Sequence, residues 1–174
     1  MATSYSPKIV TDGLVLCLDA ADRKSYPGTG TTWTDRSGNG NNGTLTNGPT
    51  FDSANGGGIE FDGTNDYVVI PNSSSIQLAA NQPFTISYFV NLDSITGNGG
   101  LMAPVMKSWF GSSYGHLLGT SNKYLLVYTD GDNSVELYVY NILDGYENKW
   151  LQITQTYDGD RIYVSEDGRR SIDK

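Results

Sequence analysis

Cysteine, histidine and charged residues are scarce in this sequence. Its 174 residues include one cysteine and one histidine, and charged residues make up 17%, against roughly a quarter in average soluble proteins. A single cysteine excludes an intrachain disulfide and a thiolate metal cluster. Cys17 lies in an apolar run, which predicts a buried and unreactive thiol.

Long hydrophobic runs are also missing. No segment approaches the ~18 apolar residues that a membrane span requires, and the N-terminus lacks a basic start followed by an apolar stretch. We therefore expect neither a signal peptide nor membrane insertion, and synthesis in the cytoplasm. The net charge of -8 repels phosphate backbones, so nucleic acid is not expected as a partner, while cation binding stays open.

The sequence is rich in turn residues and in short alternating runs. It has 21 glycines, 12 tyrosines and almost no helical period. Apolar and polar side chains alternate most clearly in residues 83–91, where the most distinct core strand is expected. Further strands are expected at residues 13–18, 59–61, 67–70, 116–120, 123–129, 135–142, 150–157 and 161–165. Many short strands with glycine turns predict an all-β fold, a two-sheet antiparallel β-sandwich.

The length of the chain predicts one domain. We assign residues 1–12 to an N-terminal arm and residues 13–174 to the domain. The arm is polar and is expected to make contacts or to move.

The first half of the sequence predicts a long loop and a hairpin. Residues 26–51 have no hydrophobic period, which predicts a long ordered loop anchored by Trp33 and Leu45. Residues 59–70 are expected to form one hairpin, in which Gly63 takes the positive φ of a tight turn.

Matches to enzyme motifs lack the context that their chemistry needs. The letters GNGNNG at residues 38–43 match a dinucleotide fingerprint, yet no helical period follows to receive a pyrophosphate. GSSYG at residues 111–115 matches a nucleophile elbow, but His116 is next to it in sequence and cannot approach from a separate loop, which favours a surface turn. Neither Glu136 nor Glu166 belongs to the set of carboxylates on one strand that glycoside hydrolysis uses. We expect no enzymatic activity.

Acidic turns offer the oxygen ligands that calcium prefers. Asp62 and Asp66 flank one glycine turn, and Asp35 and Asn39 lie in another. The alternative is that these side chains cap their own turns. The sequence requires no cofactor, and calcium is the one that these residues allow.

Exposed aromatic faces can stack on sugar rings. Trp109, Tyr114 and Trp33 lie in loop-like contexts and are the candidates for glycan binding. The alternative is that they are core residues or loop anchors, as most aromatics in a sandwich of this size are. A concave groove that holds them would favour glycan capture, whereas a flat apolar or strand-edge surface would favour assembly.

Several segments together carry a family resemblance. They are GLVLCLDAA at residues 13–21, SYPG at 25–28, WTDRSGNGNNG at 33–43, GIEFDGTNDYV at 58–68, WLQI at 150–153, YDG at 157–159 and IYV at 162–164. In these segments the chain resembles laminin G-like, concanavalin A-like jelly-roll domains, with coverage of residues 7–165. The opening YSPKIVTDG at residues 5–13 is similar to structural proteins of tailed phages.

The resemblance implies a jelly-roll fold and a non-enzymatic structural or adhesive role in a tailed-phage virion, in a fibre, a tail or a capsid decoration. The implied partners are other virion proteins, in a homo-oligomer or a larger assembly, and the implied location is the virion. The alternative role is a carbohydrate-binding module that recognises host surface glycans.

The resemblance also implies a strand that this sequence does not contain. Family members continue past the position of residues 163–164 with a closing strand that returns beside the first strand. We therefore expect the C-terminal closing strands to be supplied in trans, by a neighbouring subunit or another virion protein, or to lie outside this sequence.

Overall fold

The computed structural model describes eight parts of the chain. They are residues 9–78, 82–93, 101–107, 113–119, 123–130, 133–140, 146–167 and 169–173. The chain divides into two compact units, Met1–Gln77 and Leu78–Lys174. Each unit has its own sheets.

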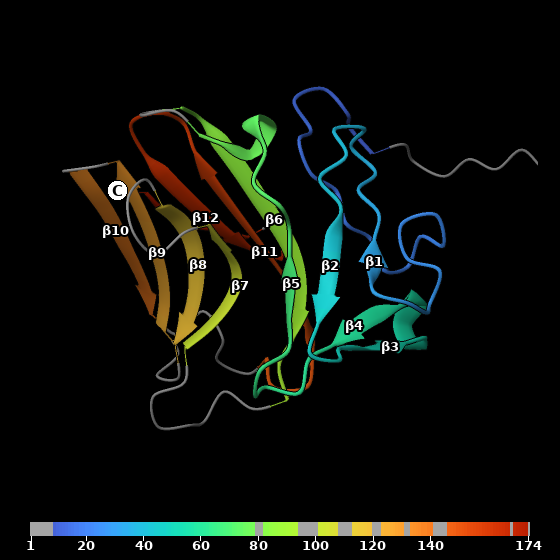
Figure 1. Cartoon of the computed structure of the whole chain (residues 1–174). Coiled ribbons are helices and arrows are strands. Elements are labelled where there is room, and N and C mark those ends of the chain that lie inside the picture. Colours follow the sequence, from blue (N-terminus) through green and yellow to red (C-terminus); the bar gives the residue numbers. More distant parts are fainter. Residues whose placement is uncertain are drawn as a thin grey trace, which may run out of the picture. The chain divides into compact units, whose positions relative to one another are not determined.

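The first unit is built from short antiparallel strands (Figure 1). Its elements are β1 (Thr32–Trp33), β2 (Gly43–Thr46), β3 (Thr50–Asp52), η1 (Ala54–Gly56), β4 (Gly58–Glu60), β5 (Tyr67–Val69) and η2 (Ser74–Ile76). β2 lies between β1 and β5, while β3 pairs with β4. The hairpin predicted for residues 59–70 is therefore wrong, because β4 and β5 pair with different strands. Gly63 nevertheless has the predicted positive φ, 70°.

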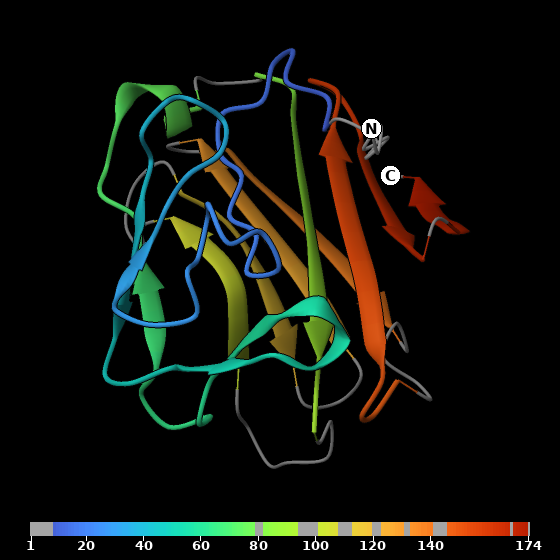
Figure 2. The ribbon, with the colours of Figure 1, turned by 90° about the vertical axis from the view of Figure 1, so that its right-hand side faces the viewer.

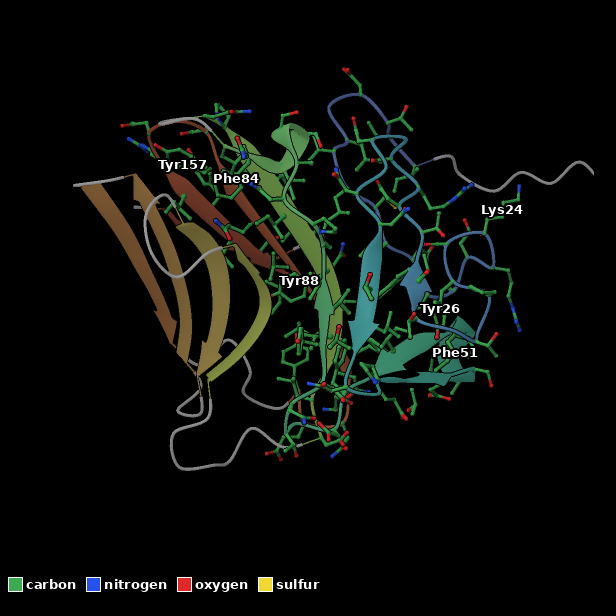
Figure 3. The ribbon with its side chains drawn as sticks, in the orientation of Figure 1. Lys24, Tyr26, Phe51, Phe84, Tyr88 and Tyr157 are labelled. Atoms are coloured by element: carbon green, nitrogen blue, oxygen red, sulfur yellow. The ribbon has the colours of Figure 1, made fainter. Side chains whose placement is uncertain are left out.

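The stretch at residues 26–51 contains β1, β2 and the start of β3, and is not a continuous loop. Its two predicted anchors hold: Leu45 is buried, and the ring of Trp33 packs edge-on against Tyr26 with the centroids 6.4 Å apart. Tyr26 also contacts Phe51, at a centroid distance of 5.7 Å (Figure 3). These aromatic contacts tie the turns of the first unit together.

Residues 13–18, expected as a strand, belong to no ladder in the described parts of the chain. Side chains of a later loop bond this segment instead. The Asn41 Nδ2 donates to the Val15 carbonyl at 2.7 Å, and the Cys17 N–H donates to Oδ1 of Asp35 at 2.9 Å. A loop therefore holds one edge of this segment.

The Cys17 thiol is half-buried. Burial raises its pKa, and the nearby carboxylates of Asp19 and Asp35 raise it further. A raised pKa favours the protonated thiol at neutral pH, while its partial exposure differs from the buried thiol that the sequence predicts.

The second unit contains two four-stranded antiparallel sheets (Figure 1; Figure 2 shows the same ribbon turned). In the order β13-β12-β11-β6, one comprises β6 (Phe84–Asn91), β11 (Trp150–Tyr157), β12 (Ile162–Glu166) and β13 (Arg169–Asp173). In the order β10-β9-β8-β7, the other comprises β7 (Leu101–Lys107), β8 (Ser113–Gly119), β9 (Lys123–Asp130) and β10 (Asn133–Tyr140). The predicted all-β antiparallel class is confirmed, while the facing of two sheets in a jelly roll stays a prediction. β7 and β13 have no counterpart among the predicted strands.

One face of the β6-β11-β12 strands carries the core of the second unit. Its buried members are Leu151, Ile153, Tyr157, Ile162 and Val164, and the residues that pack against them include Phe84, Tyr88 and Val90. The ring centroids of Phe84 and Tyr157 lie 5.9 Å apart (Figure 3). Because side chains alternate along a strand, the intervening residues point to the opposite face. Within the described ranges, no helix is both long and apolar enough to cross a bilayer.

Candidate functional site

The candidate site is the face of the β6-β11-β12 strands that points away from this core, which we call the outer face. It comprises Thr85, Ser87, Phe89, Asn91, Trp150, Gln152, Thr154, Thr156, Tyr163 and Ser165. The strand registers set these side chains in cross-strand pairs on one face. None of them is a charged residue type, although the chain carries a net charge of -8.

Hydroxyl groups form a ladder across the outer face. The Oγ1 atoms of Thr85 and Thr156 lie 3.1 Å apart, and Ser87 Oγ lies 2.7 Å from Thr154 Oγ1. The Gln152 Nε2 donates to Ser87 Oγ at 3.3 Å. These bonds fix the positions of the hydroxyls, and each hydroxyl keeps capacity for another partner because it has one donor and two lone pairs.

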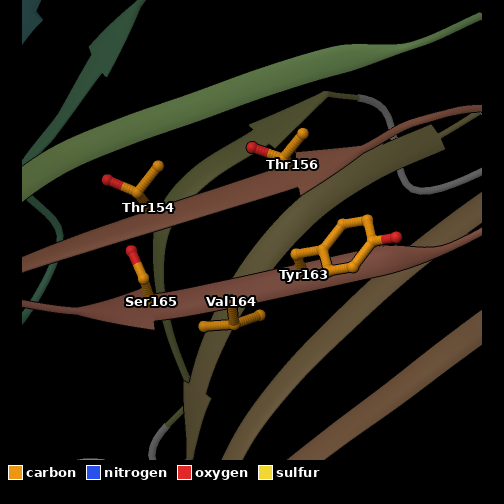
Figure 4. A pocket seen from close by; sticks show the side chains of 5 residues that line it. All are labelled: Thr154, Thr156, Tyr163, Val164 and Ser165. Carbon is orange, nitrogen blue, oxygen red and sulfur yellow. The ribbon is translucent and has the colours of Figure 1, made fainter. Parts of the chain in front are cut away.

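A hollow of about 350 Å³ lies over β11 and β12 (Figure 4). Its lining residues are Thr154, Thr156, Tyr163, Val164 and Ser165. Thr154 is opposite Ser165 in the ladder, and Thr156 is opposite Tyr163. Three aliphatic hydroxyls and a phenol ring therefore share one side of the strands, while Val164 points to the other side (Figure 4).

A carboxylate orients the ring of Tyr163. Its hydroxyl donates to Oδ2 of Asp158 at 3.1 Å. The backbone N–H groups of Arg161 and Asp160 donate to Oδ1 of the same carboxylate at 2.7 and 2.9 Å, and hold the pKa of Asp158 below its usual value. Asp158 therefore stays charged and keeps accepting the Tyr163 hydroxyl down to acidic pH.

Two aromatic rings stand out from the outer face. Phe89 is 66% exposed, and Trp150 is also exposed. They lie on neighbouring strands, since Phe89 is opposite Gln152 and Trp150 is opposite Asn91. Exposed rings can stack on a sugar or bury against another protein, while hydroxyls and amides supply directed hydrogen bonds. The outer face thus has the composition of a binding surface.

The aromatics predicted for glycan binding are not among the residues of the outer face. Trp33 belongs to the first unit, where it packs on Tyr26 and its buried Nε1 has no hydrogen-bond partner in the described structure. The backbone of Tyr114 lies in β8, opposite Tyr128 of β9. Trp109 lies outside the described residues. The position of Trp33 is that of a loop anchor, which was the alternative left open for it.

Asp35, predicted as a calcium ligand, accepts four hydrogen bonds from its own chain. Its Oδ1 accepts the N–H groups of Cys17 and Ser37, both at 2.9 Å, and its Oδ2 accepts the Ser37 hydroxyl at 2.7 Å and the Asn41 N–H at 3.0 Å. Burial alone would raise the pKa of Asp35, but the hydrogen bonds from Ser37, Cys17 and Asn41 outweigh it and hold the pKa below its usual value. These four donors occupy the lone pairs that a calcium ion would use.

The other residues predicted for calcium also bond their own chain. Asn39 Nδ2 donates to the Leu14 carbonyl at 3.0 Å. Asp62 Oδ1 accepts the Thr64 N–H at 2.8 Å, and Asp66 Oδ2 accepts the Asp62 N–H at 3.1 Å, as turn-capping side chains do. In the part of the chain that the structure describes, no three side chains of His, Cys, Asp or Glu gather in a group that could hold a metal. Calcium binding at these residues stays a prediction.

The enzyme-like motifs fall in ordinary loops and strands. Residues 38–43 lead into β2, and a strand therefore follows where the dinucleotide motif needs a helix. Ser113 begins β8, so residues 113–115 are strand and not the surface turn predicted for them, while residues 111–112 lie outside the described residues. His116 lies in the same strand, opposite Leu126 of β9.

Sequence reasoning missed the outer face, although part of its signal was available. Along Trp150–Tyr157 the polar side chains of Gln152, Thr154 and Thr156 recur at every second residue. This period predicts the strand and equally predicts an uncharged polar face. It does not predict the pairing of β11 with β6, which sets Phe89 beside Gln152.

Comparisons with known proteins bear on the fold. No protein-family model and no curated protein matches this sequence. The chain is similar to the 2.1 Å crystal structure of residues 221–444 of an S-layer domain-containing protein from Clostridium thermocellum, with a TM-score of 0.50 and 22% sequence identity. The match covers 84% of this chain and 66% of that chain, so this chain spans slightly less than two thirds of its length. A likeness at this identity concerns the fold alone.

Proposed function

We propose that this protein is a non-enzymatic structural and adhesive module of a tailed-phage virion that acts through protein contacts. The observation that supports it best is the outer face, an uncharged and hydroxyl-rich surface that exposes Phe89 and Trp150. The centres of protein interfaces are depleted of charge and enriched in aromatic residues. The virion setting rests on the sequence resemblance to structural proteins of tailed phages.

Particles of a phage that encodes this sequence should contain the chain in a fixed ratio to a known structural subunit. Quantitative mass spectrometry of purified particles measures this ratio. The double variant Phe89→Ala, Trp150→Ala should be made at the normal level but incorporated about tenfold less or worse, since two exposed anchors together contribute more than ~1.4 kcal/mol.

Phe61→Ala is the matched control, because Phe61 is an exposed aromatic of the first unit. Its incorporation should be unchanged. A chain that is abundant in infected cells and absent from particles would refute the virion proposal.

The hollow favours a second candidate function, the binding of host surface glycans. Its hydroxyls come from Thr154, Thr156 and Ser165 and lie beside the ring of Tyr163, so hydrogen bonding and stacking are available together. Calorimetric titration of the pure chain with host surface glycans tests this candidate.

The double variant Thr154→Val, Ser165→Ala should weaken glycan binding about tenfold, because each lost hydrogen bond contributes roughly 0.5–1.5 kcal/mol. Asn91→Ala changes the outer face away from the hollow and should bind as the parent protein does. No heat of binding from the parent protein would remove the glycan candidate and leave protein contact as the function of the outer face.

A further inference from the structure

Glycine directly follows asparagine at five positions of this sequence, 39, 42, 47, 55 and 98. Position 98 lies outside the described residues, and the other four lie within them. Such a pair can react within its own backbone, because glycine has no Cβ to keep its nitrogen away from the preceding side-chain amide. The reaction requires the asparagine side chain and the following peptide group to rotate toward each other, so the local structure decides which pairs react.

Three of the four described side chains are held by hydrogen bonds. The bonds run from Asn39 Nδ2 to the Leu14 carbonyl (3.0 Å), from the Asp35 N–H to Asn42 Oδ1 (2.9 Å) and from Asn47 Nδ2 to the Asn65 carbonyl (2.7 Å). Gly43, which follows Asn42, is also fixed, because it is buried in β2 and paired with Trp33 of β1. These contacts must break before the side chain can turn toward the next backbone nitrogen.

Asn55 lacks such contacts. Asn55 and Gly56 are both exposed, and in the part of the chain that the structure describes no hydrogen bond engages the Asn55 side chain. The φ of Asn55 is 53°, in the left-handed region that L-residues occupy at a cost in energy. Asn55 belongs to η1, a 3₁₀ turn of 3 residues. A turn this short has poor hydrogen-bond geometry and opens locally at low cost, which frees the backbone to rotate.

We propose that Asn55 is a site of spontaneous deamidation, and that folding protects the other three described asparagines and leaves this one reactive. The backbone nitrogen of Gly56 attacks Cγ of Asn55 and the bond from Cγ to Nδ2 breaks. The amide nitrogen leaves as ammonia, taking the proton of the Gly56 N–H. Water then opens the succinimide ring at either carbonyl, which leaves aspartate or isoaspartate at position 55. Water is the only added reactant, and nothing is oxidised or reduced.

The reaction changes both the charge and the chain path of the turn. It adds a carboxylate to a chain whose net charge is already -8. Isoaspartate also lengthens the main chain by one carbon, close to where Gly57 passes against the first loop. A Cβ at Gly57 would lie 2.9 Å from the Ala20 carbonyl oxygen and 3.2 Å from Cα of Ala21, so the chain has little room to shift there. The inference does not rest on the proposed function.

Folded and guanidinium-unfolded samples of the full chain, aged side by side in mildly alkaline buffer, test the proposal. Peptide mapping by mass spectrometry measures the deamidation rate at each position, and fragment ions separate isoaspartate from aspartate. The four positions should react at comparable rates in the unfolded chain, because glycine follows each of them. Folding should slow positions 39, 42 and 47 by about fivefold or more, since their hydrogen bonds must open first, and position 55 by less than about twofold.

Asn55→Gln is the matched variant. Glutamine keeps the side-chain amide but would have to close a larger ring, so deamidation at position 55 should be lost while the rates at the other positions stay unchanged. The pair at position 98 is measured on its own peptide. Folding that slows position 55 as strongly as the other three would overturn the inference. Faster deamidation at position 39, 42 or 47 than at position 55 in the folded chain would overturn it as well.

Discussion

Asp35→Ala should unfold the first unit at temperatures at which the parent protein is stable. The substitution removes the acceptor of four hydrogen bonds from three residues, Cys17, Ser37 and Asn41. Hydrogen bonds to a charged group contribute roughly 1.5–3 kcal/mol each, so we expect a loss on the order of 3 kcal/mol or more. Differential scanning calorimetry should show the melting temperature of that unit lowered by more than about 10 °C.

Asp62→Ala is the matched control for Asp35→Ala. Both carboxylates accept backbone N–H groups in a turn, but Asp62 is exposed and Asp35 is buried. Water replaces Asp62 as the partner of the freed N–H groups, so its loss should be much smaller. Equal losses of stability from the two substitutions would contradict the role of Asp35 as a buried acceptor of several hydrogen bonds.

The pH dependence separates the charge of Asp35 from its bulk. Its pKa is lowered in the folded protein, so it contributes stability that is present above its unfolded pKa and is lost as the pH falls through its folded pKa. The difference in stability between the parent protein and Asp35→Ala should therefore narrow below about pH 4. A constant difference from neutral to acidic pH would mean that shape, and not charge, holds the loop.

Gln155→Leu should stabilise the second unit. Gln155 is fully buried, between its ladder neighbours Ile86 and Val164, and neither its Oε1 nor its Nε2 has a hydrogen-bond partner in the described structure. Each buried unsatisfied polar group costs roughly 1–3 kcal/mol, and leucine fills a similar volume, so the free energy of unfolding should rise by about 2 kcal/mol. Urea unfolding followed by circular dichroism measures this change.

Gln152→Leu is the control on the same strand. Gln152 lies on the outer face, where its Nε2 donates to Ser87 Oγ and water can replace that partner, so its replacement should change the stability little. A loss of stability on Gln155→Leu would contradict the assignment of Gln155 as an unpartnered core amide and would indicate a bridging water there.

The long strands could be predicted from the sequence because eight residues of alternating apolar and polar side chains fit a strand and do not fit a helix. β6 and β11 each run for 8 residues, and each buries one face. The strands of the first unit have 2 to 4 residues, too few to establish a period. Their pairing depends instead on close packing: a Cβ at Gly43 would lie 2.7 Å from Cγ1 of Val68, so only glycine allows β2 to approach β5 as it does.

The candidate sites also depend partly on local sequence and partly on tertiary packing. The residue type and turn context of Asp35 were visible, and they suggested calcium. Its role in the fold depends on Cys17, which is 18 residues away, and on the loop that returns past it. Distances of this kind follow from tertiary packing and not from spacing along the chain. The outer face likewise became apparent only with the register that joins β6 to the distant β11 and β12.

The lack of charge on the outer face determines how its contacts respond to the surrounding medium. Ion pairs at a surface weaken as salt shortens the range of their field, whereas stacking and hydrogen bonds between uncharged groups do not depend on that field. Stacking on Phe89 and Trp150 would therefore weaken less with added salt than an attachment made through ion pairs.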